Sequence, residues 1–133
     1  MREILFKAKR KDNGEWIKGS YIKDPMLEIH YIFCDNYDKN AEDYCENIEI
    51  IPETLCQYTG MKDENGKKIF ENDIVIYDDG LAKIEWNNSC KAFLVVIFYM
   101  GYSVEEDLRK IKGCNLKVIR NIFDNPELLE MEE

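Results

Sequence analysis

The sequence predicts a mainly β protein in which an N-terminal β-hairpin or sheet unit packs on a small C-terminal β-barrel, with one short helix and a short C-terminal helical turn. Apolar residues alternate with polar ones over several short segments, as in half-buried strands. Asn-Gly and Asp-Gly pairs separate some of these segments and favour tight reversals. A chain of 133 residues with 45% apolar content can bury enough surface for one domain or two small, packed ones.

The N-terminal unit is predicted to begin with three strands. Alternation over residues 4–8 indicates the first strand, and the Lys-Asp-Asn-Gly turn at residues 11–14 leads into a second strand at residues 15–22. Gly19 lies inside that second strand, where a missing side chain indicates a bulge or a close neighbour. Residues 27–34, rich in Ile, Tyr and Phe, indicate the third strand.

A boundary is predicted after this unit. Residues 35–46 are polar and acidic without apolar periodicity, which is typical of a long exposed loop. Residues 47–51 indicate a short strand that Pro52 ends. We therefore divide the chain into an N-terminal domain, residues 1–52, and a C-terminal domain, residues 53–133.

The C-terminal domain is predicted to start with turns and a hairpin. Asp-Glu-Asn-Gly at residues 63–66 indicates a turn, and four β-favouring residues at 74–77 precede a second turn that ends at Gly80. Beyond it, alternate residues point the same way: Ala82, Ile84 and Trp86. A hairpin of this spacing that ends in a tryptophan resembles the opening of an SH3-type barrel.

Three further elements complete the predicted domain. Residues 91–100 are apolar on both faces, which indicates a central strand. A Ser-x-x-Glu capping box at Ser103 predicts a helix of about two turns through Ile111. Residues 116–121 indicate a last strand, and Pro126 suits the first position of a final helical turn.

One segment carries a family resemblance. Residues 57–75, QYTGMKDENGKKIFENDIV, resemble the signature QYTGLKDKNGKxIYEGDIV of the YopX-like family of phage and prophage proteins. Three positions hold a different residue from the Leu, Tyr and Gly of that signature: Met61, Phe70 and Asn72. Asn72 matters most because glycine adopts positive φ angles more readily. The resemblance extends over residues 1–19 and 118–129, and it implies no established activity.

Charge makes nucleic acid a poor default partner. The formal net charge is −9 and both predicted domains are acidic, whereas a phosphate-binding protein normally presents a basic patch. The exception is a short basic run that is interpreted as the solvated end of a hairpin: Lys7, Lys9, Arg10 and Lys11. A nucleic-acid module that uses this run remains a third hypothesis.

Cysteine and histidine usage does not indicate a catalytic or metal site. The five cysteines lack a C-x-x-C pair and are interpreted as reduced, mostly buried thiols: Cys34, Cys45, Cys56, Cys90 and Cys114. The single histidine, His30, is interpreted as a structural strand residue. No apolar run reaches the length of about 18 residues that a membrane span needs, so we expect a soluble protein in the bacterial cytoplasm.

Acidic residues around the C-terminal hairpin are the one candidate metal cluster: Asp73, Asp78 and Asp79. Carboxylate oxygens of this kind hold divalent cations in nucleases and phosphatases. Asp also recurs in turns because its side chain bonds to nearby backbone amides, and this explanation is preferred here. We therefore predict no enzyme activity, no cofactor, and no catalytic, cofactor-binding or metal residue.

The functional hypothesis is a non-enzymatic phage or prophage protein that acts through protein contacts, as a homo-oligomer and with an unidentified partner. An acidic DNA mimic that inhibits a host nucleic-acid-binding protein is the alternative, which predicts salt-sensitive capture of a basic protein. Most aromatic residues are expected in the core, but any that are exposed together would mark a partner surface: Trp16, Tyr21, Tyr31, Phe33, Tyr58, Trp86, Phe93, Phe98, Tyr99 and Tyr102.

Overall fold

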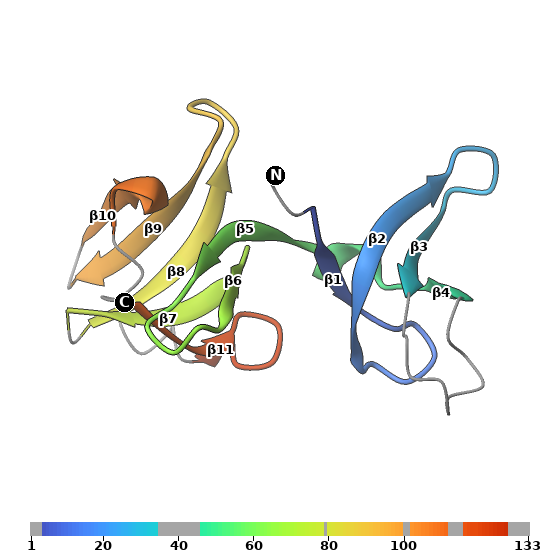
Figure 1. Ribbon diagram of the computed structural model, residues 1–133, viewed down its shortest axis with the longest axis horizontal. Helices are drawn as coiled ribbons and strands as arrows, with labels where there is room; N and C mark the ends of the chain where they lie inside the picture. The colour runs from blue at the N-terminus through green and yellow to red at the C-terminus, as the bar shows by residue number, and fades with distance from the viewer. Residues whose placement is uncertain (1–3, 35–45, 79, 100–101, 112–115, 128–133) are drawn as a thin grey trace. The chain divides into compact units, whose positions relative to one another are not determined.

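The computed structural model describes residues 4–34, 46–78, 80–99, 102–111 and 116–127 (Figure 1). The chain divides into two compact units, Met1–Tyr58 and Thr59–Glu133. The domain boundary suggested at residues 52 and 53 stays a prediction. Within the described segments, no helix has the length and apolar character to cross a membrane.

The described residues form two antiparallel sheets, which confirms the mainly β prediction. The six-stranded sheet has the order β4-β3-β2-β1-β5-β6, and the five-stranded sheet has the order β10-β9-β8-β7-β11. The strands are β1 (Phe6–Lys9), β2 (Trp16–Asp24), β3 (Ile29–Cys34), β4 (Glu46–Glu49), β5 (Cys56–Lys62), β6 (Lys68–Phe70), β7 (Asp73–Tyr77), β8 (Gly80–Asn87), β9 (Ala92–Tyr99), β10 (Tyr102–Asp107) and β11 (Leu116–Asn121). Two short 3-10 helices are η1 (Pro52–Thr54) and η2 (Leu108–Lys110).

The first unit is built on the antiparallel pairs β1–β2, β2–β3 and β3–β4. Its core consists of Ala8, Ile32 and Ile50, which are almost completely buried. Gly19 lies on β2 beside the backbone of β3, and a Cβ atom built there would sit 2.1 Å from the carbonyl oxygen of Phe33. The close neighbour predicted for this glycine is therefore confirmed.

Two predicted boundaries in this unit are shifted. The third strand begins at Ile29, because Glu28 has a positive φ of 52° and leaves the extended conformation. The fourth strand ends at Glu49, and Ile50 forms an isolated bridge with Arg10. The predicted long loop falls mainly on residues 35–45, which lie outside the described residues.

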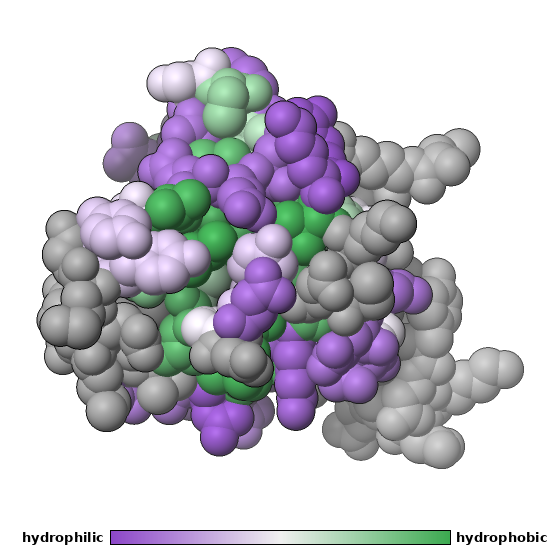
Figure 2. Space-filling model, turned by 90° about the vertical axis from the view of Figure 1, so that its left-hand side faces the viewer, coloured by the Kyte–Doolittle hydropathy of each residue, from purple (hydrophilic) through white to green (hydrophobic). Residues whose placement is uncertain are grey.

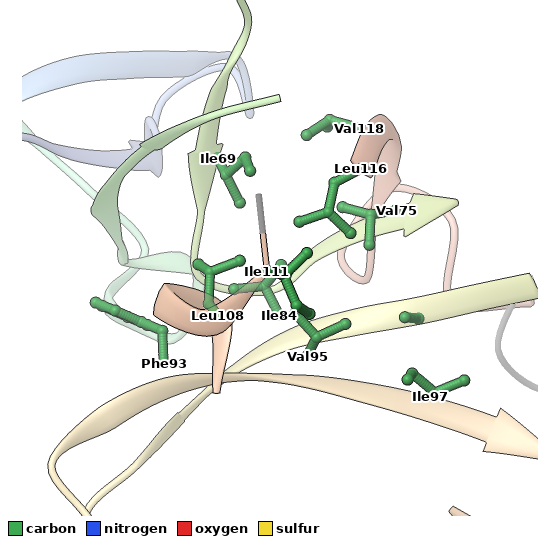
Figure 3. Packing of buried hydrophobic residues seen from close by; sticks show 11 residues of the cluster. Ile69, Val75, Ile84, Phe93, Val95, Ile97, Leu108, Ile111, Leu116 and Val118 are labelled. Atoms are coloured by element: carbon green, nitrogen blue, oxygen red, sulfur yellow. The ribbon is translucent and has the colours of Figure 1, made fainter. Parts of the chain in front are cut away.

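The second unit has the larger core (Figure 3). It is formed by side chains from β6 to β9, η2 with the residue that caps its C-terminal end, and β11: Ile69, Val75, Ala82, Ile84, Phe93, Val95, Ile97, Leu108, Ile111, Leu116 and Val118. The predicted hairpin is confirmed, since β7 pairs with β8 and Ala82 and Ile84 both enter this core. The central position predicted for the apolar run is also confirmed, because β9 lies between β8 and β10.

The strand pairing of the described residues does not close into a barrel. β10 and β11 are the two edges of the five-stranded sheet. The structure thus supports an antiparallel β unit with an apolar core, and the SH3-type barrel is not shown by its strand pairing.

The helix predicted from Ser103 to Ile111 is wrong. Tyr102–Asp107 is strand β10, and only the three residues Leu108–Lys110 form a 3-10 helix. A helix of two turns is marginal by itself, whereas β10 pairs with β9 at six positions. The capping residue is Asp107, whose side chain accepts a hydrogen bond from the backbone N–H of Arg109 at 2.9 Å.

The C-terminal end begins as predicted but is described only in part. β11 ends at Asn121, whose side-chain oxygen accepts hydrogen bonds from the backbone N–H groups of Phe123 and Asp124. A helical residue follows Pro126 at Glu127. The remainder of the predicted helical turn lies outside the described residues.

Asn72 occupies a left-handed position between β6 and β7, with φ of 70°. Its backbone N–H donates to the carbonyl oxygen of Ile84 at 2.7 Å, so the chain is held in this conformation. We expect Asn72→Ala to lower the free energy of unfolding by about 1 kcal/mol, because alanine tolerates this φ poorly. Asn72→Gly should equal or slightly exceed the original protein. Urea unfolding of both variants checks this, and an alanine variant as stable as the glycine variant would contradict it.

Candidate functional site

Exposed aromatic residues gather at the β9–β10 edge of the second unit. Tyr99 and Tyr102 stack with ring centroids 5.1 Å apart, and Tyr102 is 63% exposed. Val104 follows on the same face of β10, because Tyr102 pairs with Tyr99 and Val104 with Ile97. We call Tyr99, Tyr102 and Val104 the aromatic edge. Figure 2 shows one face on which apolar residues reach the surface between hydrophilic ones.

A hydrogen bond connects this edge to β7. The hydroxyl of Tyr77 donates to a carboxylate oxygen of Glu106 at 3.1 Å. Burial raises the pKa of Tyr77, and the bond to Glu106 raises it further, because both disfavour the phenolate. The phenol therefore stays protonated at neutral pH, and its hydrogen bond links β7 to β10.

A second exposed apolar group lies at the β2–β3 turn of the first unit, which Figure 1 shows as a projecting hairpin. Met26 is 90% exposed, Leu27 is 66% exposed, and Ile22 lies on β2 just before them. The carboxylate of Asp24 accepts hydrogen bonds from the backbone N–H groups of Met26 and Leu27, at 2.9 and 3.1 Å. We call Ile22, Met26 and Leu27 the apolar tip, and its backbone is a bonded turn.

The basic run is largely occupied within its own unit. The ammonium groups of Lys7 and Lys9 lie over the ring of Trp16, at 4.8 and 5.5 Å from its centroid. The guanidinium of Arg10 pairs with Asp12 at 2.8 Å, and the ammonium of Lys11 pairs with Glu49 at 3.1 Å. These contacts favour the interpretation of the run as a hairpin surface.

Of the three candidate metal-binding carboxylates, the structure describes Asp73 and Asp78. Asp73 is 2% exposed, and its carboxylate accepts a hydrogen bond from the backbone N–H of Phe70 at 2.8 Å. Asp78 is exposed at the end of β7, with φ of 50°. Asp79 lies outside the described residues. Nowhere in the described segments do three His, Cys, Asp or Glu side chains form a group able to hold a metal ion.

His30 contacts a tyrosine on the neighbouring strand, and the two cysteines whose side chains are described differ in burial. His30 lies on β3, and its Nδ1 is 2.6 Å from the hydroxyl of Tyr21, whose ring stacks on the imidazole. Cys56 is buried and its thiol donates to the carbonyl oxygen of Thr54 at 3.2 Å, Cys90 is exposed, and neither of the two forms a disulfide. The side chains of the other three cysteines lie outside the described part of the chain: Cys34, Cys45 and Cys114.

Within residues 57–75, the carboxylate of Asp63 accepts hydrogen bonds from its own turn and from β11. This carboxylate is 7% exposed and accepts three backbone hydrogen bonds of 2.9 Å, from Asn65, Lys67 and Val118. Burial acts to raise the pKa of Asp63, but these donors outweigh it and hold the pKa below its ordinary value. Asp63 therefore shapes the β5–β6 turn and also fastens it to β11.

Other positions of the same segment also serve the backbone. The hydroxyl of Thr59 donates to the carbonyl oxygen of Ile69 at 2.7 Å. Gly60 and Gly66 have φ angles of 90° and 79°, which glycine adopts at little cost.

A family model for the YopX protein matches residues 5–130. The chain belongs to the YopX family. The comparison with curated proteins gives no match. In this YopX protein three residues of the signature segment bond to the backbone of other segments and so stabilise the fold: Thr59, Asp63 and Asn72. Within the described segments, exposed large apolar side chains group at the aromatic edge and at the apolar tip. Sequence reasoning included Tyr99 and Tyr102 among the aromatics but missed Met26 and Leu27, although both follow Asp24-Pro25, a pair typical of turns.

Proposed function

We propose that this YopX protein is a phage or prophage protein of the bacterial cytoplasm that acts through protein contacts, without enzyme chemistry, as a homo-oligomer. The observation that carries the proposal is the exposure of Met26 and Leu27 on a hydrogen-bonded turn. Soluble proteins keep contiguous apolar surface small unless it meets a partner. A turn whose backbone is already bonded loses little conformational entropy when it is covered.

The apolar tip suits a contact between identical subunits. Its three side chains are uncharged, so they do not repel each other when the tips of two copies meet. Complete burial of a side chain such as Leu27 or Met26 contributes about 1.5–3 kcal/mol. In a closed symmetric assembly every copy gains this contribution.

Light scattering tests the role of the apolar tip. We expect the protein to be an oligomer at tens of micromolar and the double variant Met26→Ser, Leu27→Ser to be a folded monomer, as shown by a cooperative urea transition. Ile4→Ser is the matched control, because Ile4 is 72% exposed in the same unit and lies outside the tip. A monomeric original protein would refute self-association, and an Ile4→Ser variant that dissociates equally would refute the tip as its site.

A further inference from the structure

The open edge of β10 offers backbone hydrogen-bonding groups to another strand. In the described residues β10 pairs with β9 and is the last strand of its sheet. In an antiparallel pair every second residue turns its N–H and C=O away from the neighbouring strand. An edge of six residues that is not covered is a template for a further strand.

The side chains of β10 define two different faces beside this edge. Tyr102, Val104 and Glu106 lie on the same face of the sheet as the stacked ring of Tyr99. Glu105 lies on the opposite face and is exposed. Asp107 is already engaged with Arg109 at 2.8 Å, so Glu105 is the acidic group on that face with the fewest described contacts. A strand added here meets Tyr102, Val104 and the Tyr77-bonded carboxylate of Glu106 on one face. On the other face it meets the negative charge of Glu105 and Asp107.

Charge decides which occupant fits. Antiparallel pairing of two copies of β10 would place six carboxylates, three from each strand, in one ribbon whose sequence, YSVEED, contains no basic residue. Like charges on neighbouring strands are destabilising, and acidic residues are a recognised device against pairing between identical edges. A segment of opposite charge gains attraction at the same positions.

We propose that the β10 edge binds an extended basic segment of another protein as an additional strand. A Lys or Arg of that segment lies opposite Glu105, and β-branched side chains cover Tyr102 and Val104. This inference rests on the proposed function through protein contacts, and it concerns a different surface from the apolar tip. A decoy role for the acidic surface, the alternative function considered above, also requires a basic partner.

A synthetic ten-residue peptide of alternating lysine and valine, blocked at both ends, tests the proposal by titration against the full chain. We expect saturable binding that weakens as salt is raised and that is lost when alternate backbone nitrogens of the peptide are methylated. The same peptide with glutamate in place of lysine should not bind. Glu105→Lys should weaken binding of the lysine peptide by about five- to tenfold and permit binding of the glutamate peptide.

Glu64→Lys is the matched control, because Glu64 is exposed in the same unit and lies in the β5–β6 turn. It makes the same change in net charge and should weaken binding less than twofold, since its charge is remote from the added strand. Absence of saturable binding at about 1 mM peptide, equal effects of the two variants, or equal binding of both peptides would each overturn the proposal. A dimer that Glu105→Lys alters would overturn it in favour of a second copy. If the peptide does not bind but the tip variant still dissociates the oligomer, the β10 proposal fails and the proposed function stands.

Discussion

Replacing Asp63 with asparagine is expected to lower the free energy of unfolding by about 2–4 kcal/mol. The carboxylate accepts backbone hydrogen bonds on both oxygens, from Asn65 and Lys67 on one and from Val118 on the other. An amide keeps only one oxygen, so at least one buried N–H group is left facing another donor. The urea midpoint measures the loss, and amide hydrogen exchange at Val118 shows whether the tie to β11 is broken.

Glu64→Gln is the control for this prediction, since it makes the same chemical change at the next, exposed residue. Its free energy of unfolding should stay within about 0.5 kcal/mol of that of the original protein. If both variants lost the same stability, the effect would come from the charge of the turn and not from the buried hydrogen bonds.

The contribution of Asp63 should also depend on pH. Because the pKa of Asp63 is lowered in the folded protein, its stabilisation is fully present above the ordinary value of 3.8 and is lost as the pH falls through the lower folded value. The difference in stability between the original protein and Asp63→Asn is therefore expected to narrow below about pH 4. Urea midpoints of both proteins over this range measure it. A difference that stays constant would show that protonation of Asp63 does not matter.

Gly19→Ala is expected to cost about 3 kcal/mol. The added Cβ would lie 2.1 Å from the carbonyl oxygen and 2.9 Å from the carbonyl carbon of Phe33. These are backbone atoms of β3, so they cannot move away by a change of rotamer, and the β2–β3 pairing must separate locally. Amide hydrogen exchange along both strands should speed up in this variant, together with a lower urea midpoint.

Gly80→Ala provides the comparison for Gly19. Its Cβ would be no closer than 3.6 Å to its nearest neighbour, the carbonyl oxygen of Tyr77, which is ordinary contact. The free energy of unfolding of Gly80→Ala should change by less than about 1 kcal/mol. Similar losses at both glycines would mean that the close approach to Phe33 is not what makes Gly19 necessary.

Local sequence predicted most of the strands because their signals are local. Alternation and turn residues placed the β1–β2 hairpin and the β7–β8 hairpin, and the turn at residues 63–66. The same kind of signal misled at Ser103, where a capping box favours a helix. Its preference amounts to a single turn, and the six pairs with β9 outweigh it.

The sequence indicated what kind of residue would mark a partner surface, but it did not show where on the fold such residues lie. The sequence left open whether any aromatics are exposed together, and the structure shows such a pair in Tyr99 and Tyr102. Their exposure follows from the position of β10 at the end of a sheet, which no local pattern states. The exposure of Met26 likewise depends on how the turn is bonded through Asp24.

The sequence by itself determined that this is a mainly β member of the YopX family, and it located the turns and the glycine with a close neighbour. Only the tertiary structure decided that Asp63 binds the backbone of Val118, 55 residues away, and that β10 is an open edge. The reason is physical. Turn and alternation preferences arise from a few neighbouring residues, whereas buried hydrogen bonds and strand order depend on which distant segments meet.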